Sequence, residues 1–297
     1  MTSTIIDQGI EVAAPARRQS LYVLAQLLKR RTALAGLVIV LVVVLMAMFA
    51  PLVSPYDPLE QHIHDSFETP TLSHPLGTDN LGRDTLSRII YGSRTSLQVG
   101  VFAIGLGAAV GVVLGMISGY FRGVIDVVAM RVMDALLALP GLLLTIAIAT
   151  SLGTGLKALV IAVGIASTPH FARLLRGSVL VARELDYVYA AKAIGASDAR
   201  IMFYHIWPNC LQPIVVQATL GIGVGILVGA GASFLGVGVQ PPAADWGLMV
   251  STGHQYVFNN WWLSVPPGLA IMFTVLGFNL LGDGLRDALD PRLRGVR

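Results

Sequence analysis

Long apolar stretches dominate this sequence, and they limit the folds that the chain can adopt. A helix that crosses the hydrocarbon core of a bilayer needs about twenty consecutive apolar residues. Six stretches meet this length, some of them loosely: 33–53, 97–119, 124–152, 154–172, 211–235 and 263–282. The composition, 55% hydrophobic and 12% charged residues, is atypical of a soluble domain. The sequence therefore predicts an all-α membrane protein with six transmembrane helices.

The third and fourth stretches are less uniform than the others. The third carries Asp126, Arg131 and Asp134 near one end, where we expect it to continue into the membrane interface. Arg131 and Asp134 are three residues apart, a spacing at which helical side chains can pair. Pro140 predicts a kink, because proline lacks the amide hydrogen that a helix interior needs. The fourth stretch is expected to end at Ala172.

The positive charges are distributed unevenly among the segments that flank six spans. If the N-terminus is cytoplasmic, sixteen of the twenty Lys and Arg residues fall on the inner side, as is typical of cytoplasmic loops. Both termini, 1–32 and 286–297, are then predicted to be cytoplasmic, and 54–96 is an outer loop. The first span, 33–53, follows more than thirty residues and is too long for a signal-peptide core, so we expect a retained anchor.

A polar segment, 186–209, lies between the fourth and fifth stretches on the predicted cytoplasmic side. A loop that only returns between two spans needs a handful of residues, so this one is expected to have a structure of its own. Its Ala-rich first part, and Ser197 followed by Asp198 at a helix start, predict two short helices hinged at Gly195. Its small side chains would let the surface of another protein approach closely.

The spacing of small residues and proline in this segment resembles the EAA loop of ABC importer permeases. In that family the loop forms coupling helices that dock into a cytoplasmic ATPase. The resemblance assigns this coupling role to Asp186, Tyr189, Ala190, Ala191, Gly195, Ala196 and Pro208. Two positions depart from the family pattern: Tyr189 stands where many permeases carry Glu, and Trp207 stands where Leu is usual. The first departure puts a salt bridge to the ATPase at this point in doubt, whereas docking by shape is unaffected.

The outer loop carries a second specific signal, the string HPLGTDNLGRDTLSRIIYGSRTSL at 74–97. Residues 77–79 predict a turn that leads into a short helix. That helix would have one apolar side and lie at the outer membrane interface. The apolar side consists of Leu86, Ile89 and Ile90.

This string resembles the region before the second span in the C-type permeases of dipeptide, oligopeptide and nickel ABC importers. Together with PYDP at 55–58, the segment 186–209 and GDGLRDALDPRLR at 282–294, the resemblance covers all but about the first twenty residues. It implies the type I ABC importer permease fold, with a permease domain at 97–285 and cytoplasmic coupling helices.

The chain is expected to use ATP only through partners. No G-x-x-x-x-G-K-[ST] motif is present, and the Gly-rich run 221–238 lacks the lysine that would reach phosphates. The resemblance implies that this chain and a homologous B-type permease form the membrane pathway. Two cytoplasmic ATPases that hold ATP and Mg would drive it, and an extracytoplasmic binding protein would deliver substrate. No enzyme activity, catalytic residue or cofactor is expected in this chain, and the single Cys210 favours neither a disulfide nor a metal cluster.

Small and polar residues inside the spans are candidates for close helix packing or for the translocation path, and the sequence leaves these two roles open. Glycines recur at a spacing of four in two spans. The first set is Gly107, Gly111, Gly115 and Gly119, and the second is Gly221, Gly225 and Gly229. The polar candidates are Gln217, Thr274 and Asn279. His62 and His64 are expected to be solvated rather than metal-binding, whereas His170 and His205 are expected to be interfacial or docking residues rather than proton carriers.

Two alternatives to an importer are a secondary transporter or channel that works without ATP and a purely structural membrane scaffold, which would leave the long polar segment 186–209 unexplained. A secondary transporter or channel usually keeps ionisable residues near mid-membrane, whereas the middles of all six stretches lack them. We therefore expect a permease of an ATP-driven importer in a bacterial plasma membrane. Its substrate is expected to be a dipeptide or short oligopeptide, with nickel or another small solute as the alternative.

Overall fold

The computed structural model describes residues 26–289, and within them the secondary structure is helical apart from one isolated bridge between Thr78 and Asp84. The longer helices are α2 (Arg31–Met48), α4 (Thr85–Phe121), α5 (Gly123–Leu137), α6 (Gly141–Leu152), α7 (Leu156–Ala182), α10 (Trp207–Phe234) and α12 (Val265–Leu289). The short ones are α3 (Ala50–Val53), α8 (Asp186–Ala193), α9 (Asp198–Arg200) and α11 (Trp246–Gly253). The all-α prediction is confirmed for the part of the chain that is described.

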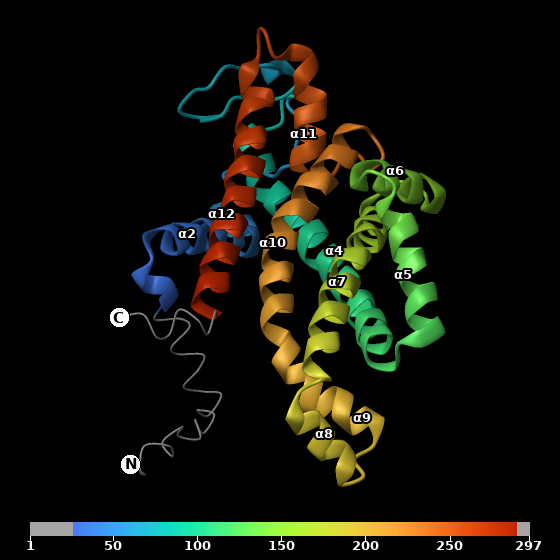
Figure 1. Ribbon diagram of the computed structural model, residues 1–297. Coiled ribbons are helices and arrows are strands. Elements are labelled where there is room, and N and C mark those ends of the chain that lie inside the picture. Colours follow the sequence, from blue (N-terminus) through green and yellow to red (C-terminus); the bar gives the residue numbers. More distant parts are fainter. Residues whose placement is uncertain (1–25, 290–297) are drawn as a thin grey trace.

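Five helices in this part are long and apolar enough to cross a membrane, and the bent pair of α5 and α6 makes a sixth span if it is taken as one. α4 and α7 lie side by side, α10 packs on both, and α12 packs between α10 and α2 (Figure 1). The outer segment 54–84 and α11 are at one end of the molecule, whereas α8 and α9 are at the other. The predicted terminal segments, 1–32 and 286–297, lie largely outside the described residues.

The contact between α4 and α7 is made by glycines. A Cβ atom added to Gly115 would come 2.4 Å from the carbonyl oxygen of Ala172, and one added to Gly111 would come 2.7 Å from that of Thr168. Such distances leave room at these positions for the hydrogen atom of glycine but not for a Cβ atom. The backbones of α4 and α7 can therefore approach this closely only because these residues are glycines. The alternative left open for this glycine set is therefore resolved in favour of helix packing.

The second glycine set also serves helix packing. Gly229 of α10 faces Val99 of α4, whose Cγ1 atom would be 2.6 Å from an added Cβ. Gly225 and Gly221 face Ile104 of α4 at 3.2 and 3.3 Å, which is a less crowded contact.

The outer segment differs from its prediction. Asp84 caps α4 by accepting a hydrogen bond from the Ser87 amide at 2.7 Å, and the helix then continues without a break to Phe121. The expectation of a separate short helix is wrong, because these residues form the first turns of α4. Ile89 and Ile90 are buried, and the Ile89 carbonyl accepts a hydrogen bond from the Trp246 indole of α11 at 2.9 Å.

The predicted kink at Pro140 is confirmed, since α5 and α6 meet there at an angle of 96°. The predicted end of the fourth span at Ala172 is wrong. α7 passes through Pro169 and continues to Ala182, because the carbonyl contacts with α4 continue along Gly115 and Gly119.

The predicted pairing of Arg131 with Asp134 is also wrong. Asp134 accepts a hydrogen bond from Arg173 of α7 at 2.5 Å. One turn further along α7, Arg176 donates two hydrogen bonds to Asp126 at 2.5 and 2.6 Å. Both carboxylates of α5 therefore pair across to the neighbouring helix α7.

Candidate functional site

The segment between α7 and α10 folds into two short helices with a turn at Gly195, as the sequence predicts. α8 ends at Ala193, and Gly195 has a φ of +80°, a left-handed conformation that side chains with a Cβ rarely adopt. The Ser197 hydroxyl accepts a hydrogen bond from the Arg200 amide and so caps α9. A π-helical turn, Ile201–Ile206, then leads into α10.

An apolar cluster beneath this pair of helices holds it against the ends of α4 and α7. Val188 and Ala191 of α8 are buried together with Ile201 and Ile206 of the π-helical turn. They pack in one core cluster with Tyr120 at the end of α4. The loop is therefore a rigid extension of the helix bundle rather than a loose connection.

Five large apolar or aromatic side chains of this segment are exposed among its charged residues. We name this set of side chains the loop face and define it by Leu185, Tyr189, Ile194, Phe203 and Tyr204. Each of these side chains is exposed, from 46% for Leu185 to 86% for Ile194. Large exposed apolar patches on a protein mark contact surfaces. The sequence analysis missed Ile194, Phe203 and Tyr204, although large apolar residues inside a charged segment are a signal that could have found them.

The residues expected to form the coupling surface differ in their exposure to solvent. Asp186, Tyr189, Ala190, Gly195 and Pro208 are exposed, and Ala196 is half-buried. Ala191 is 4% exposed and points into the core cluster instead. The helical period explains the difference, because Ala190 and Ala191 lie about 100° apart around α8.

Charged and phenolic groups form a network at the start of α8. Tyr189 donates a hydrogen bond to Glu184 at 2.6 Å, and Arg122 donates to the same carboxylate at 2.8 Å. The hydrogen bond from Tyr189, together with the nearby Arg122 and Arg183, holds the pKa of Glu184 below its usual range. The same hydrogen bond raises the pKa of Tyr189. The carboxylate is therefore ionised at neutral pH and lies next to position 189.

A second contact ties α9 to the membrane helices. The Tyr120 hydroxyl donates a hydrogen bond to Asp198 at 2.5 Å, and the Lys192 ammonium lies 5.6 Å from the centre of the Tyr120 ring. Arg183 donates to the Tyr120 carbonyl oxygen at 2.5 Å. Tyr120 thus contacts all three parts of the segment, α8, α9 and the end of α7.

The polar candidates inside the spans fall into two groups. The Thr274 hydroxyl is buried and donates to the Ala270 carbonyl at 2.7 Å within α12, which is a packing role. Asn279 borders an apolar cavity of about 550 Å³ between α10, α11 and α12, and Gln217 borders one of about 390 Å³ between α7, α10 and α12. The structure does not bring these three residues together at one place.

Among residues 26–289, no group of three His, Cys, Asp or Glu side chains lies close enough together to hold a metal ion. His62 lies 3.3 Å from Glu60 on the exposed outer segment. His170 is exposed on α7, and His205 is half-buried in the π-helical turn.

Residues 111–295 match the family described as the binding-protein-dependent transport system inner membrane component. Residues 20–70 match the N-terminal transmembrane domain of oligopeptide transport permease C. The part of the chain that the first family covers includes α5 to α12 and therefore the whole segment between α7 and α10.

Several curated proteins are similar over most of their length. The chain is 45% identical to a dipeptide transport system permease protein of Alkalihalophilus pseudofirmus over 91% of this chain and 88% of that protein. It is 43% identical to a glutathione transport system permease protein of Pectobacterium atrosepticum, over 90% and 89%. It is 42% identical to a probable D,D-dipeptide transport system permease protein of Escherichia coli, over 87% of each chain.

A solved structure supports the fold. The crystal structure of an amino acid ABC transporter with histidines superposes with a TM-score of 0.53 at 19% identity. The match covers 69% of this chain and 95% of the other.

Proposed function

The chain belongs to the family of binding-protein-dependent transport system inner membrane components, and we propose that it forms half of the membrane pathway of an ATP-driven importer for dipeptides or short oligopeptides. A homologous permease supplies the other half. An extracytoplasmic binding protein delivers the peptide, and two cytoplasmic ATPase domains, which hold ATP and Mg, supply the energy.

The observation that carries this proposal is the loop face on a rigid support. Its exposed apolar side chains lie on α8, at the two ends of α8 and on the π-helical turn, short helices that the core cluster fixes to the ends of α4 and α7. A partner that moves these helices therefore moves the membrane helices with them. Rigid elements joined at a few hinges are suited to switching between two states.

The peptide substrate is supported by the relatives, whose names include transport systems for dipeptides, D,D-dipeptides and glutathione. The cytoplasmic location of both termini and of the segment 186–209 is supported by the distribution of Lys and Arg.

Uptake by the reconstituted complex tests the proposal. Proteoliposomes that contain both permeases and the ATPases, with the binding protein added outside, are expected to accumulate radiolabelled dialanine only when ATP is enclosed. Accumulation of nickel but not of dialanine would favour the alternative substrate. Uptake of dialanine without ATP would contradict the ATP-driven mechanism.

A further inference from the structure

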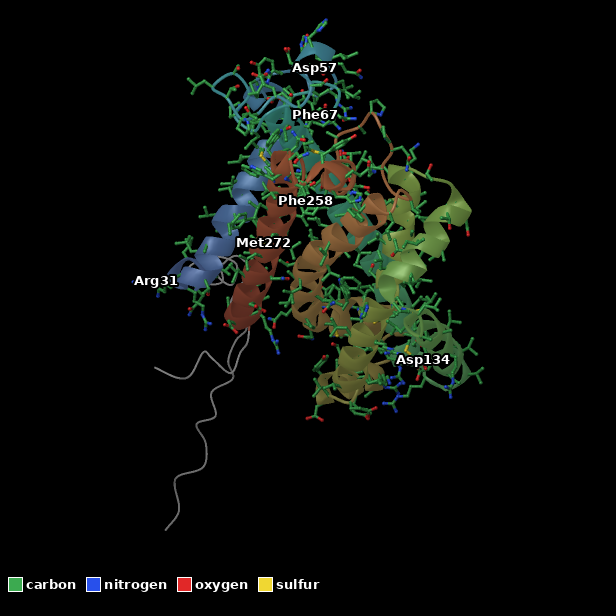
Figure 2. The ribbon with its side chains drawn as sticks, turned by 90° about the horizontal axis from the view of Figure 1, so that it is seen from above. Arg31, Asp57, Phe67, Asp134, Phe258 and Met272 are labelled. Carbon is green, nitrogen blue, oxygen red and sulfur yellow. The ribbon has the colours of Figure 1, made fainter. Side chains whose placement is uncertain are left out.

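The ion pair between Asp134 of α5 and Arg173 of α7 is unusual because both side chains are about half exposed, 46% and 48%. Arg131 and His170 are also exposed, each three residues before one member of the pair. Residues three apart share a side of a helix. Four ionisable side chains therefore gather on one side of the α5–α7 pair, which we name the polar side (Figure 2 labels Asp134).

The polar side lies level with an apolar part of the bundle. α4 carries no charged residue between Arg94 and Arg122. Gly115 of α4 packs against the backbone of Ala172 and Arg176, so Arg173 is level with it. Gly115 is seven residues from Arg122, or roughly 10 Å along the helix at about 1.5 Å per residue. The pair is therefore level with the uncharged length of α4.

The side of the same helices that faces α4 is apolar. A cavity of about 470 Å³ there is lined by apolar side chains, among them Leu106 of α4, Met133 and Leu136 of α5, and Ile161 and Ile165 of α7. Ionisable groups at membrane depth face water or protein rather than lipid, because exposing charge to hydrocarbon is costly. The polar side is accordingly the one that faces away from lipid.

The pair is not needed to hold α5 in place. Asp126 and Arg176 already join the same two helices through two hydrogen bonds, and the Asp126 side chain is only 13% exposed. An additional ion pair that stays half exposed adds little to stability. Its opposite charges remain free to take other partners.

We infer that Asp134 and Arg173 line the water-filled path and bind the charged ends of a peptide in transit, an inference that rests on the proposed function. The Arg173 guanidinium then donates hydrogen bonds to the peptide carboxylate, and the Asp134 carboxylate accepts hydrogen bonds from the peptide ammonium. The ion pair between Asp134 and Arg173 is thereby exchanged for two ion pairs, each between one of these residues and the peptide. No charge is left unpaired at any stage, so the exchange leaves no lone charge within the wall of the path.

A double variant, Asp134→Asn with Arg173→Gln, tests the inference in the complete reconstituted complex. Its two amides can still hydrogen-bond and hold α5 to α7, but they carry no charge. The maximal rate of dialanine uptake is expected to fall about tenfold, the size of one lost charge-assisted hydrogen bond, while the complex still co-purifies with its ATPases.

A matched control is Arg30→Gln. Arg30 forms an ion pair with Asp287 whose side chains are both 43% exposed, and this pair lies between the start of α2 and the end of α12. The control is expected to transport dialanine at the wild-type rate. A double variant that transports dialanine as fast as the wild type overturns the inference alone. If the double variant no longer assembles, the two residues serve a structural contact within the complex, and this result also overturns the inference. A wild-type complex that does not transport dialanine overturns the inference and the proposed function together.

Thiol labelling tests the water-filled surrounding without transport. In a Cys210→Ala background, Ala138→Cys places a thiol four residues after Asp134 on the polar side, and Val132→Cys places one on the other side of α5. A membrane-impermeant reagent, methanethiosulfonate ethyltrimethylammonium, applied to inside-out vesicles is expected to modify position 138 and not position 132. No reaction at position 138, or equal reaction at both, overturns the inference.

Discussion

The Tyr189 hydroxyl donates a 2.6 Å hydrogen bond to the carboxylate of Glu184, five residues earlier in the chain. Many permeases with an EAA loop carry Glu where this chain has Tyr189. The hydrogen bond places a carboxylate from the preceding turn beside that position. Glu184 thereby supplies a negative charge next to position 189, where α8 itself has Tyr instead of Glu.

Replacing Glu184 should therefore impair coupling more than shortening Tyr189. Tyr189→Phe removes one exposed hydrogen bond and is expected to lower ATP-dependent uptake less than about threefold, as exposed contacts contribute little. Glu184→Gln removes the charge shared by Tyr189 and Arg122 and is expected to lower uptake further. Uptake per ATP hydrolysed measures the difference, and an equal effect of the two substitutions would contradict the role given to Glu184.

The loop face should bind the ATPases through its apolar side chains. Ile194→Glu and Phe203→Glu are each expected to weaken co-purification of the ATPases by about tenfold or more, as central apolar contacts often do. The control is Ile63→Glu, since Ile63 is 72% exposed on the outer segment. Retention of the ATPases by both loop-face variants would show that the partner docks elsewhere.

Ala190 and Ala191 should respond differently to the same substitution. Ala191→Glu introduces an unpaired charge into the core cluster and is expected to lower the stability of the loop by about 2–5 kcal/mol. Ala190→Glu is expected to leave the fold intact and to impair docking only. Limited proteolysis of the segment 186–209 distinguishes the two results, and resistance of Ala191→Glu to cleavage would argue against its buried position.

The effect of a Gly→Leu substitution on assembly of the complex should depend on the space around the glycine that is replaced. Gly115→Leu forces α4 away from a backbone carbonyl and is expected to abolish assembly, whereas Gly225→Leu meets a side chain, Ile104, that can shift and should be milder. Gly105 has no heavy atom within 4 Å of an added Cβ, so Gly105→Leu is the control. Complex yield after purification measures this order, and a normal yield for Gly115→Leu would contradict the close packing of α4 and α7.

Reporter fusions should establish the orientation. A reporter that is active only outside the cytoplasm is expected to be active after Asp245 and silent after Ser197, in line with the distribution of Lys and Arg. The reverse pattern would place the loop face on the side without ATP and would refute its coupling role.

Local features of the sequence predicted local structure well. The kink at Pro140, the turn at Gly195 and the cap at Ser197 each depend on the chemistry of one residue and its neighbours. Such features are decided within a few residues of the chain, so a sequence pattern is sufficient to find them.

Features that depend on distant segments were not predictable in the same way. The burial of the first turns of α4 depends on Trp246, which lies 157 residues after Ile89 and donates a hydrogen bond to its carbonyl oxygen. The partner of Asp134 is likewise on another helix. Hydrophobic runs in a sequence show where a membrane span can lie. The first turns of α4 are partly polar, so the sequence assigns them to a loop, and only their contact with a distant segment shows that they belong to the helix.

The unbroken length of α4 has a geometric consequence. The helix begins at the outer segment and ends at Phe121, next to Tyr120, whose hydroxyl donates a hydrogen bond to Asp198 of α9. Its 37 residues measure roughly 55 Å at about 1.5 Å per residue. A stiff rod of this length that tilts by about 5° around one end displaces the other end by about 5 Å. A small rocking of α9 at one membrane surface thus becomes a movement of atomic size at the opposite surface, without any rearrangement inside the helix.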